Sequence, residues 1–313
     1  MARRWMKLVT VFAMSSLALA GCGGDQPTDE ESTMPLRGTM LTVGTQDYYT
    51  LGIIGEVYSQ ALEHAGYTVE RRLTINSQSR YMDLTGRGIL DLSIGYSGQL
   101  LRYWEPGTAA RSADEITEKL RQVTPSLVRL MTPSTVTDQE VCVVTRQFAD
   151  QWNLVTVSDL AHVTVPMVIG GNAEALSRLG ADLADTTEPA APPALLNTYG
   201  VETTFKELPG RDDQLAIQAL QHGEIQIADV HRSNPLIAAE NLVVLEDPDE
   251  IFSVSRIVSF ATLNIDQAAN DLLDRINATL TTDDLMMMNQ RYLLAGTPVE
   301  VVATDWLRQH QFI

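Results

Sequence analysis

The sequence predicts an α/β protein with parallel, doubly wound sheets, and two stretches carry that prediction. The stretch from Asp213 to Pro248 is typical of a helix, a strand and a connection to a second strand. The stretch from Leu41 to Ile94 is typical of strand, helix, strand, helix and strand. Strands that alternate with helices pair in parallel through crossovers. With 313 residues, the chain is long enough for two lobes, each with its own core.

A helix followed by a strand is the clearest local pattern in the chain. Apolar residues share one helical face over residues 215–220, and Gly223 suits the left-handed position at which such a helix ends. Residues 225–230 then alternate as a strand, and the polar run 231–234 leaves its carboxyl end. Open α/β sheets hold their ligands at that end of their strands, so this turn is a candidate part of a binding site. A second buried strand is predicted at 242–245.

The amino-terminal part of the folded sequence repeats this alternation. Strands are predicted at 41–45, 67–73 and 89–94. Residues 51–65 present an apolar face that predicts a helix ending at Gly66. Ser77 can cap a second helix that continues to about Thr85. The order predicts parallel pairing of the strands in this lobe.

Further elements keep the α/β pattern along the rest of the chain. They are helices at 115–123, 266–280, 282–294 and 298–309, and strands at 141–145, 165–169 and 257–263. Residues 179–193, rich in Ala, Asp, Thr and Pro, are expected to form an exposed insertion. Leu285, Met286 and Met288 are interpreted as core packing and not as a cofactor site.

Charge and motifs exclude several classes of function. The formal net charge of −18 disfavours nucleic acid or a bare anionic lipid surface as a partner. The five histidines show no metal-ligand spacing, and neither a serine-nucleophile motif nor a phosphate-binding glycine-rich loop occurs. We therefore expect a protein that is not an enzyme and that holds no metal or cofactor.

The first residues predict export. A basic run within residues 1–7 precedes an apolar stretch over residues 8–20. That stretch is too short to span a bilayer, and the combination is typical of a signal peptide, here residues 1–21. No apolar run of about 18 residues follows, so attachment to a membrane would have to come from the start of the chain.

A lipid anchor is predicted directly after the signal peptide. Leu19-Ala20-Gly21-Cys22 resembles a bacterial lipobox, so Cys22 is expected to receive the lipid; a secretory signal without lipid is the alternative. Residues 22–38 are polar, acidic and interrupted by Gly and Pro, which indicates a flexible tether. Cys142 then has no partner within the chain, so no structural disulfide is expected.

Several short motifs occur in an order that resembles one family. They are Val43-Gly44, Ala65-Gly66-Tyr67, Gly88-Ile89-Leu90-Asp91-Leu92, Tyr96-Ser97-Gly98-Gln99 and the unit over residues 213–248. Their order resembles the glycine betaine, choline and carnitine-type substrate-binding proteins of osmoprotectant ABC transporters, over residues 41–312. The resemblance implies an extracytoplasmic receptor that binds a small solute, works with ABC permease subunits and is held at the cell membrane by its lipid anchor.

The resemblance also implies the architecture. Family members have the two-lobed periplasmic-binding-protein fold of type II, in which two doubly wound α/β lobes are joined by two hinge crossings and close around the ligand. The crossings are expected near residues 138–141 and 249–255. The first lobe would then comprise residues 39–140 and 256–313, and the second lobe residues 141–255.

The family holds a quaternary ammonium group in a box of tyrosine rings, because such a cation has no N–H to donate and is best stabilised by ring faces. The positions that the resemblance assigns to the ligand are Gln46, Tyr96, Gln99, Val141, Arg178, His231 and Ser255. Tyr96 keeps one of four tyrosines, whereas Val141, His231 and Ser255 replace the other three. Arg178 matches an arginine that binds the ligand carboxylate, and the two glutamines replace a lysine and a threonine.

The loss of three rings is expected to weaken the binding of glycine betaine and choline by about two decades or more in affinity. A histidine with a pKa near about 6.5 at position 231 would add repulsion toward a cation as the pH falls. Tyr48, Tyr49 and Tyr81 are candidates for rebuilding the box and are equally typical packing residues. Two alternatives stay open: a receptor of the same fold for an aromatic or polyhydroxylated solute, and a cell-envelope lipoprotein outside transport.

Overall fold

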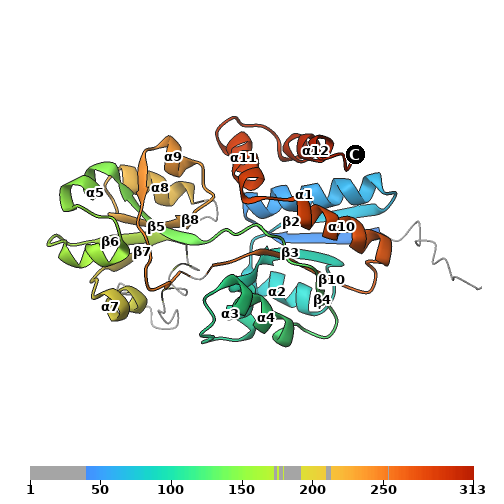
Figure 1. The fold of residues 1–313 in the computed structure, drawn as a ribbon, viewed down its shortest axis with the longest axis horizontal. Coiled ribbons are helices and arrows are strands. Elements are labelled where there is room, and N and C mark those ends of the chain that lie inside the picture. The colour runs from blue at the N-terminus through green and yellow to red at the C-terminus, as the bar shows by residue number, and fades with distance from the viewer. Residues whose placement is uncertain (1–39, 173–174, 176–178, 180–191, 209–212, 253) are drawn as a thin grey trace, which may run out of the picture. The chain divides into compact units, whose positions relative to one another are not determined.

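The computed structural model describes residues 40–172, 175, 179, 192–208, 213–252 and 254–313, which all fall within one compact unit. Within these residues the strands form two sheets of five strands, and helices lie on both faces of each sheet (Figure 1). The predicted α/β class and the two-lobed architecture are confirmed. The predicted signal peptide and tether lie outside the described residues.

The first sheet contains the amino-terminal strands. In spatial order its strands are β2 (Thr68–Ile75), β1 (Met40–Gln46), β3 (Leu92–Tyr96), β10 (Ile257–Ala261) and β4 (Arg129–Leu130). β1 pairs in parallel with both β2 and β3, as the alternation predicts. β10 runs antiparallel to its neighbours β3 and β4.

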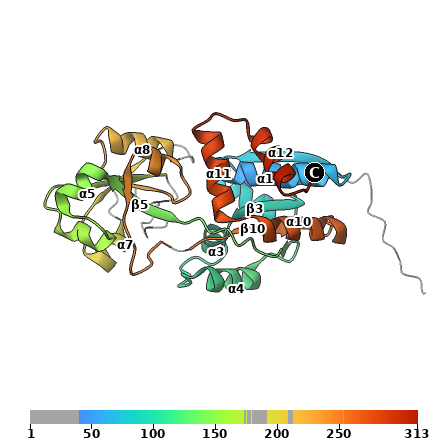
Figure 2. The same ribbon diagram turned by 45° about the horizontal axis from the view of Figure 1, so that its top comes forward.

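Two groups of helices cover the first sheet (Figure 2). One group shares a core that includes Tyr58 and Trp306, and it consists of α1 (Tyr49–His64), α10 (Gln267–Thr279), α11 (Thr282–Leu293) and α12 (Val299–Gln309). The other shares a core that includes Tyr81 and Phe260, and it consists of α2 (Gln78–Gly86), α3 (Ser97–Trp104) and α4 (Ala113–Val123). The predicted cap of α2 is present, because the Ser77 side chain accepts a hydrogen bond from the backbone N–H of Arg80 at 3.3 Å.

A glycine lets α1 approach the first sheet closely. A Cβ added to Gly55 would lie 2.6 Å from a methyl carbon of Leu73 on β2 and 3.1 Å from Cγ2 of Thr45 on β1. Any larger residue would therefore push the helix away from the strands. The close fit fixes the start of α1, and with it Tyr48, directly beyond the carboxyl end of β1.

The second sheet has the same plan. In spatial order its strands are β7 (Thr204–Glu207), β6 (Val168–Gly171), β8 (Ile227–His231), β5 (Glu140–Thr145) and β9 (Leu242–Val244). Its helices are α5 (Arg146–Trp152), η1 (Val157–His162) and α7 (Pro193–Tyr199) against one core, and α8 (Gln214–Gln221) and α9 (Leu236–Ala239) against the other. Gly223 follows α8 with φ +73°, as predicted for the residue that ends this helix.

The strands predicted over residues 41–94 pair in parallel, but each sheet also contains antiparallel pairs, and the two crossings explain why. The chain passes to the second sheet between β4 and β5, and returns between β9 and β10. Glu140, the first residue of β5, lies opposite His231, the last of β8; Ile257, the first of β10, likewise lies opposite Tyr96, the last of β3. A strand that enters a sheet at the carboxyl edge of its neighbours must run antiparallel to them.

The two crossings lie side by side. The backbone N–H of Asp138 donates to the carbonyl of Ser255 at 2.9 Å, and Thr137 forms an isolated antiparallel bridge with Arg256. The predicted lobe limits, 140/141 and 255/256, fall at the start of β5 and just before β10. The limits themselves stay a prediction.

Several boundaries differ from the sequence predictions. β3 begins at Leu92 and not at 89, because the N–H of Ile89 still bonds to the carbonyl of Leu84 in the turn that ends α2. β6 begins at Val168 and not at 165. Most of the predicted insertion over residues 179–193 lies outside the described residues, but Leu179 at its start is buried in the core of the second sheet. Elements α3, α5, α7, α9, β4 and β7 were not predicted.

Candidate functional site

Three aromatic rings meet at the carboxyl ends of strands from both sheets. Tyr96 ends β3 and His231 ends β8, while Tyr48 is the second residue after β1 and precedes α1. The His231 ring stacks on Tyr96 with 5.2 Å between centroids, and it meets Tyr48 edge-on at 5.5 Å. The two tyrosines contact each other at 6.0 Å. We call Tyr48, Tyr96 and His231 the ring cluster; all three residues are buried.

Carboxylates surround the histidine of the ring cluster. Nδ1 of His231 lies 3.0 Å from Oδ2 of Asp213, and the same oxygen accepts a hydrogen bond from the His231 backbone N–H at 2.9 Å. Nε2 lies 3.8 Å from Oε1 of Glu140. Burial alone would lower the pKa of His231, but the charges of Asp213, Asp138 and Glu140 outweigh it and raise the pKa to about 10. These carboxylates therefore favour the protonated form of the ring.

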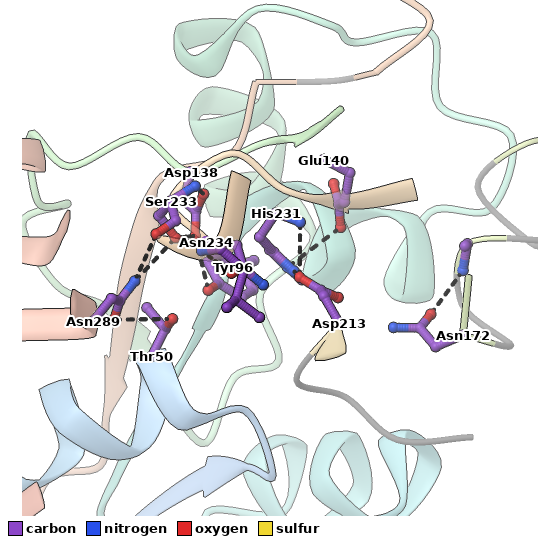
Figure 3. Close-up of polar contacts among 12 residues, drawn as sticks. Thr50, Tyr96, Asp138, Glu140, Asn172, Asp213, His231, Ser233, Asn234 and Asn289 are labelled. Carbon is purple, nitrogen blue, oxygen red and sulfur yellow. Dashed lines mark hydrogen bonds and ion pairs between the residues drawn. The ribbon is translucent and has the colours of Figure 1, made fainter. Parts of the chain in front are cut away.

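Asp138, in the first crossing, joins the ring cluster to the loop after β8. Its carboxylate accepts hydrogen bonds from the Tyr96 hydroxyl at 3.2 Å, from the Ser233 N–H at 3.0 Å and from the Ser233 hydroxyl at 2.7 Å (Figure 3). Burial raises the pKa of this carboxyl, and burial together with the charge of Asp138 raises the pKa of Tyr96 well above its usual value. One buried carboxylate at the crossing thus links Tyr96 of the first sheet to the loop that follows β8 of the second sheet.

Asn289 on α11 extends this network. Its side-chain amide donates to the Ser233 hydroxyl at 3.1 Å and to the Ser233 carbonyl at 3.3 Å, and its oxygen accepts from the Thr50 hydroxyl at 3.3 Å (Figure 3). Thr50 belongs to α1 and Ser233 follows β8, so the amide ties helices of the first sheet to the second sheet.

The predicted ligand positions Tyr96 and His231 come together in the ring cluster, but Val141 does not join them. Its side chain packs in a core that includes Ala216 and Val230, beneath α8. Neighbouring residues of a strand point to opposite faces, so the residue of β5 that reaches His231 is Glu140, one position earlier.

The remaining predicted positions lie around the start of α3 and at the end of β1. The Ser255 hydroxyl accepts a hydrogen bond from the Gly98 N–H at 3.2 Å, and a Cβ added to Gly98 would lie 2.6 Å from that oxygen. Gln99 is buried in the first turn of α3. Gln46 is fully buried, and its amide has no hydrogen-bond partner among the residues that the structure describes. Arg178 lies outside the described residues.

The three tyrosines considered as replacements for the box lie in different surroundings. Tyr48 joins the ring cluster. Tyr81 is a core residue whose hydroxyl donates to the carbonyl of Ile94, and Tyr49 stacks on Tyr292. The expectation of an ordinary histidine pKa at position 231 was wrong, because the sequence does not show that Asp213 and Glu140 meet the ring.

Sequence reasoning missed the acidic residues of the site. Asp213 precedes α8 in a left-handed conformation, with φ +60°, and that conformation returns its carboxylate to the end of β8. Asp138 lies in the first crossing, and Glu140 begins β5 directly after it. One sequence signal could have found Asp138 and Glu140. They are two positions apart at the start of a predicted strand, and residues two apart on a strand point to the same face.

The fold is that of a two-lobed substrate-binding protein, and the candidate site lies at the carboxyl edges of its two α/β sheets. None of the helices in the described residues is both long and apolar enough to cross a bilayer. The family described as "Substrate binding domain of ABC-type glycine betaine transport system" matches residues 39–309. The chain belongs to this family, and it is a substrate-binding receptor of an ABC importer for osmoprotectants.

Solved structures share the fold. A glycine betaine/carnitine/choline ABC transporter protein has a TM-score of 0.68 at 18% identity, over 88% of this chain and 98% of that one. Lactococcal OpuAC, in a closed conformation with glycine betaine, has a TM-score of 0.60 at 15% identity, over 87% of this chain and 96% of that one. An ABC-transporter choline binding protein in complex with choline has a TM-score of 0.59 at 13% identity, over 87% and 89%.

Proposed function

We propose that this receptor binds a small quaternary ammonium solute at the ring cluster, and that it does so weakly. The observation that supports this most is the meeting of two tyrosine rings from the first sheet with buried carboxylates at the start of the second sheet. Ring faces and carboxylates both favour a cation. Only two tyrosines are present, however, and the charged ring of His231 already lies against them.

Calorimetry with glycine betaine, choline and carnitine tests this proposal. We expect dissociation constants in the millimolar range, which corresponds to about −4 kcal/mol. Tyr96→Ala should abolish the binding, because it removes the ring that stacks on His231 and the hydroxyl that bonds to Asp138. Tyr103→Ala, which changes an exposed tyrosine, should leave the binding unchanged.

Two results would contradict the proposal. Micromolar or tighter binding of glycine betaine by the wild type would show that the ring cluster does not weaken the site. Unchanged affinity in Tyr96→Ala would show that the solute binds elsewhere.

A polyhydroxylated solute is the second candidate, and one residue favours it. The Gln46 amide is fully buried at the carboxyl end of β1 and lacks a hydrogen-bond partner in the described part of the chain. An amide offers two donors and an acceptor, which suit hydroxyl groups. Binding of a sugar or polyol that Gln46→Leu abolishes, with no response to glycine betaine, would favour this candidate.

We also propose that Cys22 carries a lipid that holds the receptor at the extracytoplasmic face of the cell membrane, where it delivers solute to permease subunits. Its support is the lipobox-like run at residues 19–22. The wild type should partition into the detergent phase, and Cys22→Ala should move to the aqueous phase or stay unprocessed. Cys142→Ala, which changes a buried cysteine, should still partition into detergent. An aqueous wild type with a cleaved signal peptide would refute the anchor.

A further inference from the structure

The His231 ring has the surroundings that a bound cation would need. It lies 5.2 Å from the ring centroid of Tyr96 and 5.5 Å from that of Tyr48, within the distance at which ring faces attract a positive charge. Its two nitrogens face the carboxylates of Asp213 and Glu140, at 3.0 Å and 3.8 Å. Its side chain is 8% exposed.

A buried cation is tolerated only where opposite charges and hydrogen bonds compensate its loss of water. Here Asp213 and Glu140 supply the charges, and Asp138 adds a third carboxylate that contributes to the charge balance of His231. The Tyr96 ring stacks on the imidazole, and the Tyr48 ring meets it in an edge contact. Both kinds of partner are therefore already engaged by a side chain of the protein itself.

We infer that the His231 imidazolium is an internal occupant of the cation position between Tyr48 and Tyr96, which an incoming quaternary ammonium group must displace. This inference rests on the proposed function, because it assumes that the ring cluster is the solute site. It makes His231 the residue that determines how tightly the cluster binds a cation, and it explains weak binding by competition as well as by the loss of rings.

The position of His231 adds a consequence for the two lobes. The histidine ends β8 of the second sheet, whereas Tyr96 ends β3 of the first sheet and Tyr48 lies between β1 and α1. A solute that bridges the lobes would make the same contacts. The histidine therefore supplies, from within the chain, an interlobe contact that competes with the solute.

Removal of the side chain gives the sharpest test. His231→Ala should bind tetramethylammonium at least about tenfold more tightly than the wild type, since two ring faces become available to it. Imidazole at pH 6 should raise the melting temperature of His231→Ala by refilling the position, and it should leave the wild type unchanged. His222→Ala, which changes an exposed histidine, should behave as the wild type in both measurements. In His231→Ala combined with Tyr96→Ala, both responses should disappear.

His231→Gln and the wild type itself keep the test independent of how well His231→Ala folds. The glutamine variant lacks the charge, so it should also gain affinity for tetramethylammonium. In the wild type, the ring nitrogens of His231 should give the ¹⁵N resonances of a doubly protonated imidazole at pH 7. A neutral tautomer at that pH, or no gain in affinity in either folded variant, would overturn the inference. If Tyr96→Ala still abolished wild-type binding of glycine betaine, the proposed function would stand without it.

Discussion

The free energy of unfolding should fall by about 2 kcal/mol between pH 7 and pH 8.5, because one buried proton is lost on unfolding at about 1.4 kcal/mol per pH unit. The proton belongs to His231, whose pKa is raised to about 10. The stabilisation is complete below the unfolded-state pKa of about 6.5 and disappears as the pH rises through about 10. Urea unfolding at a series of pH values measures the fall.

Other ionisable groups lie close to His231. Asp213, Glu140 and Asp138 face its ring, and burial raises the pKa of Asp138. Burial raises the pKa of Tyr96 and of Cys142 well above their usual values, and the contribution of Cys142 begins to fall only near its unfolded-state pKa of about 8.5, at the upper end of this pH interval. His231→Gln should lose the fall, and His222→Gln should keep it. An equal fall in His231→Gln would assign the proton to another residue.

Asp138→Ala should destabilise the protein by about 3 kcal/mol or more, because it leaves three buried donors without their acceptor. The donors are the Tyr96 hydroxyl and the N–H and hydroxyl of Ser233. The network also holds Asn289, so we expect the loss to affect both sheets. Urea unfolding at pH 7 measures it.

The matched control for this prediction is Asp150→Ala, which removes an exposed carboxylate at the surface of α5. Such surface changes usually alter stability by less than about 0.5 kcal/mol. A loss in Asp138→Ala as small as that of the control would mean that water replaces the carboxylate at the crossing.

Sequence patterns correctly predicted those features of the fold that depend on residues close together in the chain. The end of α8 before Gly223 and the cap of α2 by Ser77 depend on residues within a few positions of each other. The parallel pairing of β1 with β2 and β3 follows from short helical connections. The direction of β5 and β10 could not be predicted locally, because it depends on which edge of a sheet the returning chain reaches.

The candidate site shows the same limit. Tyr96 and His231 were predicted from the resemblance, and the strand ends explain why they meet. Val141 packs in the core, whereas Glu140, one position earlier, reaches His231, because one position along a strand exchanges the two faces. Asp213 meets His231 because its backbone adopts a left-handed conformation. The presence of an aspartate in the sequence does not predict that conformation. The charge of the histidine depends on those contacts.

The place of β10 between β3 and β4 governs the order in which the two sheets can be completed. β4 has been synthesised by residue 130, but its partner in the sheet arrives only at residues 257–261. The five strands of the second sheet lie together between residues 140 and 244. On a growing chain, the second sheet can therefore be complete before the first. The first sheet has to wait for β10, and until then β4 and one edge of β3 lack their partner strand.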